Sequence, residues 1–306
     1  MAAMMTLCAQ PGFAQRSFTA VSMPTDSSNA RKLMPPKGGA AAKPTKVAVA
    51  KPARSNFAHN QIENARVLAA RTDKRFELKQ LFRQRGLEYP AAEIFMRILK
   101  RERQLEMWVR PAAQDTFVLL KTYEICALND KPGPKRARGD QQTPEGFYYI
   151  DNFNPRSDYH LSLRVNYPNA SDAALGAGHT LGGDVFIHGG CKTAGCMAIT
   201  DENIKEVYWL AVEARDHGQA RIPVHIFPSR LSDNGLRLLG NVFKDEPDLV
   251  RFWSNLKRGY DYFEQTHKLP VVDINPRGRY VFNLQNKPGL LGKATSADSA
   301  GAPPQH

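Results

Sequence analysis

The most informative stretch of this chain is Val185-Phe-Ile-His188-Gly-Gly-Cys191-Lys-Thr-Ala-Gly-Cys196-Met-Ala-Ile-Thr200-Asp201. A short apolar segment ends at His188, glycines follow it, and Thr200 precedes a run of apolar residues with helical spacing. We therefore expect a strand over 184–188, a tight connection, and a helix capped by Thr200. A connection of this kind brings an imidazole within reach of a thiol, which is what a cysteine nucleophile requires.

Cys196 is the candidate nucleophile, and His188 is the candidate base that activates it. Gly195 has no side chain and lets the turn approach a substrate carbonyl closely, while the charge of Lys192 favours a thiolate. The competing interpretations are an inert buried thiol at 196 and a core histidine at 188. A carbonyl bonded to one imidazole nitrogen would still fix the tautomer that the other nitrogen uses.

The composition bounds the class of protein. A chain of 306 residues with 42% hydrophobic content can bury one sizeable core, and it holds no apolar run of membrane-spanning length. The formal charge of +12 suggests nucleic-acid binding until it is located along the chain. Residues 15–60 hold eight Lys or Arg against one acid, so we expect a disordered cationic linker there and no nucleic-acid partner.

The first fourteen residues resemble the end of a secretory signal, with small residues at Gly12-Phe-Ala14. We therefore expect a signal-peptide remnant over 1–14 and export to the periplasm or cell envelope. Without Cys8, three cysteines remain, and this odd number leaves at least one thiol free. The role of Cys191 remains open: it could pack in the core, form a disulfide with Cys196, or support the site from behind the catalytic residues.

The remaining pattern predicts an α+β fold, with a mainly β catalytic core and helices before and after it. We expect helices within 61–85 and over Ala91–Arg101, which together form a helical lead-in over 61–103. Strands follow in a core that spans 104–228, with a closing strand at Ile222–Phe227, and a glycine-rich rim lies at 176–183. The expected strands are 105–109, 117–127, 146–151, 160–165 and 184–188. A helical extension over 229–288, with helices within 233–266, and a disordered tail over 289–306 complete the chain.

Four stretches together resemble the L,D-transpeptidase catalytic domain (YkuD-type) family, and in particular its YafK-like murein branch. The resemblance covers about 93–228, and the stretches occur in the family's order and spacing. They are Gly133-Pro-Lys135 with Gly139-Asp140 and Thr143-Pro-Glu-Gly-Phe-Tyr148; His160-Leu-Ser-Leu163 with Tyr167-Pro-Asn169; Ile187-His-Gly189 through Cys196 to Asp201; and Val224-His-Ile-Phe-Pro228.

The resemblance implies a β-sandwich enzyme without a cofactor, which remodels or cross-links the cell wall and influences cell shape. Its cysteine attacks the carbonyl that joins the third, L-centred residue of a peptidoglycan stem to D-alanine, and a thioacyl enzyme forms. By position, Cys196 would be the nucleophile and His188 the base, with backbone N–H groups at Gly195, Ala194 and Cys196 holding the oxyanion. The substrate-binding candidates are His160, Gly189, Thr193 and Arg164.

Two departures from the common family pattern leave the acyl acceptor open. Ala198 stands where the pattern has an arginine, and the connection between His188 and Cys196 is shorter than in most of the family. The acceptor is then a stem amine, an amine of a wall-attached protein, or water. With water the enzyme would be a cysteine amidase or L,D-carboxypeptidase that cleaves the same amide, in peptidoglycan or in a protein–peptidoglycan link.

Other classes of protein fit the sequence less well. A zinc site would need His179, His188, Cys191 and Cys196 as ligands, and this spacing matches structural zinc poorly, so we expect no metal. The chain holds no Gly-x-Ser-x-Gly motif of a serine hydrolase. A non-catalytic wall-binding module is a remaining alternative, which would not need a reactive thiol.

Several polar residues have a structural interpretation beside the functional one. His160 and His225 fall on expected strands, where packing is the leading role, although His160 would also suit the cleft. Asp140 and Glu145 flank a turn and suit turn capping better than acid–base chemistry. Arg164 is either a solvated strand residue or a bidentate partner for a stem carboxylate.

Overall fold

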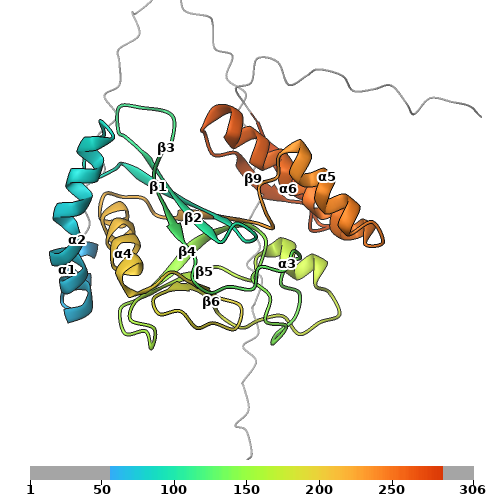
Figure 1. Cartoon of the computed structure of the whole chain (residues 1–306), viewed down its shortest axis with the longest axis horizontal. Helices are drawn as coiled ribbons and strands as arrows, with labels where there is room; N and C mark the ends of the chain where they lie inside the picture. Colours follow the sequence, from blue (N-terminus) through green and yellow to red (C-terminus); the bar gives the residue numbers. More distant parts are fainter. Residues whose placement is uncertain (1–55, 285–306) are drawn as a thin grey trace, which may run out of the picture. The chain divides into compact units, whose positions relative to one another are not determined.

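The computed structural model describes residues 56–284, which lie within one compact unit (Figure 1). The expected signal segment over 1–14, nearly all of the linker over 15–60, and the tail over 289–306 lie outside the described residues. The linker prediction is wrong at its end, because helix α1 (Phe57–Ile62) begins within it. The Phe57 ring packs edge-on against Phe153, 4.9 Å between centroids, and the Ala58 amide donates to Asp216.

Helix α2 (Ala65–Gln84) confirms the helical prediction for the residues after 61. Asn64 caps it by accepting a hydrogen bond from the Arg66 amide, and one face of the helix is buried. This face packs on helix α4 (Asp201–Asp216), which Thr200 caps through the Asn203 amide as expected. None of the helices between residues 56 and 284 combines the length and the apolar character needed to cross a membrane.

The helix expected over Ala91–Arg101 is wrong, because residues 93–99 form strand β1 (Glu93–Leu99). Six of its seven residues are buried, since β1 lies inside the sheet with both faces covered. A strand buried on both faces loses the alternation of apolar and polar residues. The spacing of its apolar residues then also fits one face of a helix, so a 3.6-residue pattern wrongly predicts a helix here.

The core is one curled eight-stranded sheet, in the order β3-β2-β1-β8-β4-β5-β6-β7, so the expected α+β class is confirmed. The other strands of this sheet are β2 (Gln104–Arg110), β3 (Val118–Glu124), β4 (Gly146–Asn154), β5 (Ser162–Val165), β6 (Val185–His188), β7 (Met197–Ala198) and β8 (Ile222–Phe227). Strand β8, which was expected to close the sheet, lies inside it between β1 and β4. It runs parallel to β1 and antiparallel to β4.

Helices cover both faces of the sheet (Figure 1). On one face, α4 buries Ile204, Val207, Tyr208 and Ala211 in the main apolar core, together with residues of α2. On the other face, Trp253 and Leu256 of helix α6 pack against Phe227 and other sheet residues. His225 is buried on β8 between the rings of Phe95 and Phe147, so its expected structural role is confirmed.

The C-terminal extension contains the expected helices, α5 (Asp233–Val242) and α6 (Pro247–Thr266), and also an unexpected hairpin of β9 (Val271–Ile274) and β10 (Tyr280–Asn283). Helix α3 (Ala170–Leu175) lies close to the hairpin turn, because the Ser171 hydroxyl donates to the Gly278 carbonyl. A buried ion pair between Lys100 and Glu145, 2.8 Å apart, anchors α6 through the Trp253 indole N–H. Glu145 also accepts from the Gly133 amide, so its role extends beyond the expected turn capping.

Candidate active site

The two catalytic candidates lie at the ends of neighbouring strands. His188 ends β6 and Cys196 directly precedes β7, and these strands run parallel, with His188 opposite Ala198. The Cys196 sulfur therefore lies beside Phe186, whose amide donates to it at 3.4 Å. Residues 186 and 188 share one face of the strand, because successive side chains alternate. His188 and Cys196 accordingly line one cavity of about 340 Å³.

The His188 imidazole is buried and held in one orientation. Its Nδ1 lies 2.6 Å from the Gly189 carbonyl oxygen. A carbonyl only accepts, so Nδ1 carries the proton and Nε2 presents a lone pair. The Tyr159 ring packs on the other side of the imidazole, with 4.6 Å between centroids and 35° between planes. No hydrogen bond joins His188 to Cys196 among the described residues.

Burial sets the protonation states of both groups. It raises the pKa of the Cys196 thiol, although the Phe186 amide, Thr193 and the positive charge of Lys135 oppose this effect. Burial also lowers the pKa of the His188 imidazole. The resting site therefore holds a thiol and a neutral imidazole rather than an ion pair. The cation that favours the thiolate is Lys135, to which the sequence motifs assign no such role, and not Lys192.

The turn before the thiol offers two backbone donors. Gly195 adopts φ +112°, and its carbonyl accepts from the Thr143 hydroxyl at 3.1 Å. The Cys196 amide already donates to the Thr193 hydroxyl at 2.8 Å. The Ala194 and Gly195 amides donate to no group in the described part of the chain, so they are available to an oxyanion. Thr193 and Ala194 both line the cavity.

Gly189 packs tightly and does not line the cavity. A Cβ atom there would lie 2.5 Å from Asp201 Oδ1 and 2.7 Å from the Tyr159 carbonyl oxygen. The next amide, from Gly190, donates to the same Asp201 carboxylate at 2.7 Å. Gly189 therefore has a structural role, because the absence of a side chain lets the turn pack against helix α4.

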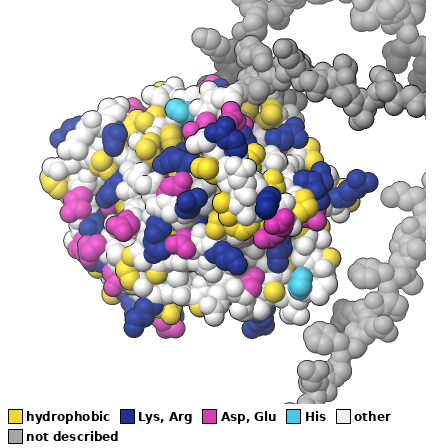
Figure 2. Space-filling model, turned by 45° about the vertical axis from the view of Figure 1, so that its right-hand side comes forward, with side chains coloured by type: hydrophobic (Ala, Val, Ile, Leu, Met, Phe, Trp, Pro, Cys, Tyr) yellow, Lys and Arg dark blue, Asp and Glu magenta, His cyan; other side chains and the backbone are white. Residues whose placement is uncertain are grey.

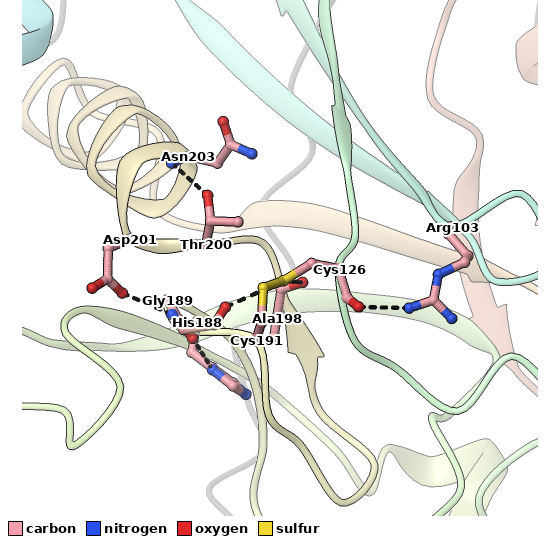
Figure 3. The surroundings of a disulfide bond; sticks show 10 residues. Arg103, Cys126, His188, Gly189, Cys191, Ala198, Thr200, Asp201 and Asn203 are labelled. Carbon is pink, nitrogen blue, oxygen red and sulfur yellow. Dashed lines mark hydrogen bonds between the residues drawn. A yellow bond between two sulfur atoms is a disulfide. The ribbon is translucent and has the colours of Figure 1, made fainter.

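A disulfide joins Cys191 to Cys126, at a sequence separation of 65 (Figure 3). This bridge overturns the alternative pairing of Cys191 with Cys196, and it leaves Cys196 as the free thiol of the described residues. It also fastens the loop that leads to Cys196 to the segment after β3, where the Arg103 guanidinium donates to the Cys126 carbonyl. Because Cys191 is bridged, its sulfur is not a metal ligand. No group of three metal-binding side chains lies together within residues 56–284.

Two other substrate-binding candidates lie away from the cavity lining. His160 precedes β5 with φ +67° and is not on a strand as expected. Its carbonyl accepts from Arg66 of α2, which also binds the Ser157 carbonyl. Arg164 pairs with Asp151 at 2.9 Å, as a solvated strand arginine does.

Asp140 caps its turn by accepting from the backbone amides of Arg136, Ala137 and Gln142, as expected. Tyr159, which packs on the His188 ring, and Asp201, which accepts from the Gly190 amide, support the site, although the sequence motifs assigned neither of them a role. Their sequence neighbours give no signal, because each acts on the 188–190 corner from a different segment of the chain.

Comparisons with known proteins identify relatives of this chain. The family model of the YkuD L,D-transpeptidase catalytic domain matches residues 107–226. The Escherichia coli (strain K12) protein named "Putative L,D-transpeptidase YafK" is 39% identical over 191 residues, which are 61% of this chain and 73% of that protein. The protein of the same name from E. coli O157:H7 matches equally.

Solved structures give weaker matches. The helical cell shape determining protein Pgp2 of Campylobacter jejuni, as a K307A mutant, matches with a TM-score of 0.34 and 24% identity, over 45% of this chain and about half (48%) of that structure. Bd1075 of Bdellovibrio bacteriovorus matches with a TM-score of 0.33 and 19% identity, over 56% of this chain and 60% of its own. At these TM-scores the likeness carries no functional information.

Proposed function

This chain belongs to the L,D-transpeptidase catalytic domain (YkuD) family, and from that membership we propose that it is a cysteine acyltransferase acting on peptidoglycan stem peptides. The observation that carries the proposal is the position of His188 and Cys196, which line one cavity with a neutral imidazole and a thiol. The free imidazole nitrogen and the sulfur are the two groups that a thioacyl mechanism needs.

In the first half-reaction the stem amide carbonyl enters the cavity beside Cys196. His188 Nε2 takes the thiol proton as the sulfur attacks, so that charge develops only when substrate is bound. The amides of Ala194 and Gly195 stabilise the oxyanion of the tetrahedral intermediate. His188 then returns the proton to the departing D-alanine amine, and a thioester to Cys196 remains.

In the second half-reaction an acceptor attacks the thioester and His188 removes the proton from the acceptor. The bond between the acyl carbon and the Cys196 sulfur then breaks, and His188 returns the proton to the departing sulfur, which restores the thiol. An amine acceptor gives a transpeptidase, whereas water gives an L,D-carboxypeptidase or an amidase that releases a wall-attached protein. Water is the second candidate acceptor. The connection 189–195 is short and is fastened by the disulfide at Cys191, so little chain is available to cover the thioester and keep water away from it.

The site suits work outside the cytoplasm, in the periplasm or cell envelope. Disulfides persist in oxidising compartments and are rare in reducing ones. The bridge between Cys126 and Cys191 supports the proposed export, and peptidoglycan lies in the same compartment.

Mass spectrometry of stem peptides incubated with the pure protein tests the proposal. We expect wild type to release D-alanine and to form either dimers or hydrolysed stems, and to carry a transient acyl mass on Cys196. Cys196→Ala should lose all turnover with an unchanged circular dichroism spectrum. His188→Ala should slow acylation by about a hundredfold, the usual effect of losing a general base. Turnover that persists in Cys196→Ala would refute the mechanism.

A further inference from the structure

A groove of about 560 Å³ lies between the segment 131–142 and the C-terminal extension, and it is larger than the cavity at Cys196. Its apolar lining includes Leu175 of helix α3 and, from the region of α5 and α6, Phe243, Leu249 and Phe252; Pro132 and Pro134 line the opposite segment. Apolar walls with a few polar groups at this volume are typical of ligand sites. The groove shares no lining residue with the active-site cavity.

Two of the four basic residues that line the groove, Arg136 and Arg251, already form ion pairs within the protein. Arg136 pairs with Asp172 and stacks on the Phe252 ring, 5.0 Å from its centroid. Arg251 pairs with Asp248. These contacts hold the apolar floor and the helix end in place.

Three charged groups at the rim remain without an ion pair among the described residues, namely Lys131, Arg279 and Glu246. Lys131 and Arg279 are exposed; Lys131 lies in the connection between β3 and β4, and Arg279 lies at the turn of the C-terminal hairpin. Figure 2 shows the side of the molecule that carries α5 and α6, where Lys and Arg side chains are interspersed with acidic and hydrophobic ones. Two free cations and one free carboxylate complement a ligand that carries carboxylates and one amino group.

The groove is adjacent to the catalytic turn through one short loop. Gln142 lines the groove, and its carbonyl oxygen lies 3.0 Å from the position that a Cβ atom of Gly195 would take. The neighbouring Thr143 binds the Gly195 carbonyl. The loop 140–143 therefore contributes Gln142 to the lining of the groove and at the same time supports the turn before Cys196.

We propose that this groove is a second peptide-binding site, which takes a short peptide with free carboxylates and a free amino group. Under the proposed function this peptide is a stem of peptidoglycan other than the one that reacts at Cys196. Lys131 and Arg279 bind its carboxylates, Glu246 binds its amino group, and the apolar floor contacts its methyl and methylene groups.

Isothermal titration of a synthetic stem tetrapeptide tests this site. The protein is wild type with Cys196 alkylated by N-ethylmaleimide, which fills the active-site cavity and prevents turnover. We expect binding to persist, and Lys131→Gln with Arg279→Gln to raise Kd about tenfold, as two lost charge contacts do. An N-acetylated, carboxyl-amidated tetrapeptide should bind about as weakly to the unsubstituted protein.

The matched control is Arg138→Gln with Arg277→Gln. These exposed arginines lie on the same two segments but outside the groove, and they remove the same charge. Equal weakening in both double variants would mean non-specific attraction and would overturn the proposal. So would a loss of binding on alkylation, an unchanged Kd in the groove variant, or equal competition by a glycan strand without peptides. Binding in the groove without any acyl transfer would instead refute the proposed function alone.

Discussion

Replacing both bridged cysteines, Cys126→Ser with Cys191→Ser, should lower the free energy of unfolding by about 4 kcal/mol. The two cysteines are separated by 65 positions in sequence. Closing a loop of that length lowers the entropy of the unfolded chain, which at 25 °C corresponds to about 4 kcal/mol of stability. The two serine hydroxyls fit into the space that the sulfur atoms occupy, so the folded state should keep its secondary structure. Because the bridge fastens the loop before Cys196, the acylation rate should also fall.

Urea unfolding followed by tryptophan fluorescence measures this change, with linear extrapolation to water. Wild type in excess reductant should unfold like the double variant, and peptide mapping after alkylation shows whether Cys126 and Cys191 have been reduced. Cys196→Ser is the matched control, because it removes a sulfur from the same loop but keeps the bridge. Equal unfolding midpoints for oxidised wild type and the double variant would refute the reasoning.

Three further results are expected. Neutral His188 is the reactive form and burial lowers its pKa, so the acid limb of kcat/KM should be centred below pH 6.5. Burial raises the pKa of the Cys196 thiol, so the rate of its alkylation should increase with pH throughout the neutral range and should not level off before about pH 9. Alkylation that is already fast and independent of pH at pH 5 would contradict a neutral pair. Gly189→Ala should lower the free energy of unfolding by about 1–3 kcal/mol, because its Cβ would lie 2.5 Å from Asp201 Oδ1. Gly240→Ala on helix α5, where φ is not positive and the nearest atom lies 3.9 Å from the added Cβ, should cost less, and the reverse order would contradict the packing. Arg66→Ala should lower kcat/KM about tenfold by freeing the two carbonyls that it binds, and Arg66→Lys should recover part of this loss; equal rates for all three proteins would exclude a positioning role.

The sequence was sufficient to predict those parts of the molecule that local chemistry determines. In β2 the apolar residues Leu105, Met107 and Val109 recur at every second position, and Thr200 combines a capping hydroxyl with a helical pattern, so both elements were predicted correctly. The pairing of His188 and Cys196 in one cavity followed from the glycines between them, because so short a connection limits their separation.

The errors concern features that distant segments determine. Strand β1 looked helical because neighbours far along the chain bury both of its faces. The partner of Cys191 is 65 residues away, and no spacing rule specifies such a pairing. The actions of Tyr159 on His188 and of Lys135 on Cys196 likewise depend on the folded positions of separate loops.

The interior position of β1 also limits how this protein can be divided. The family match covers 107–226, whereas β1 occupies 93–99 and hydrogen-bonds to both β2 and β8. A gene fragment cloned at the limits of the match would delete a central strand and create two unpaired sheet edges, which promote aggregation. Expression or complementation studies should therefore begin upstream of Glu93, and the insolubility of a shorter fragment would say nothing about its catalytic competence.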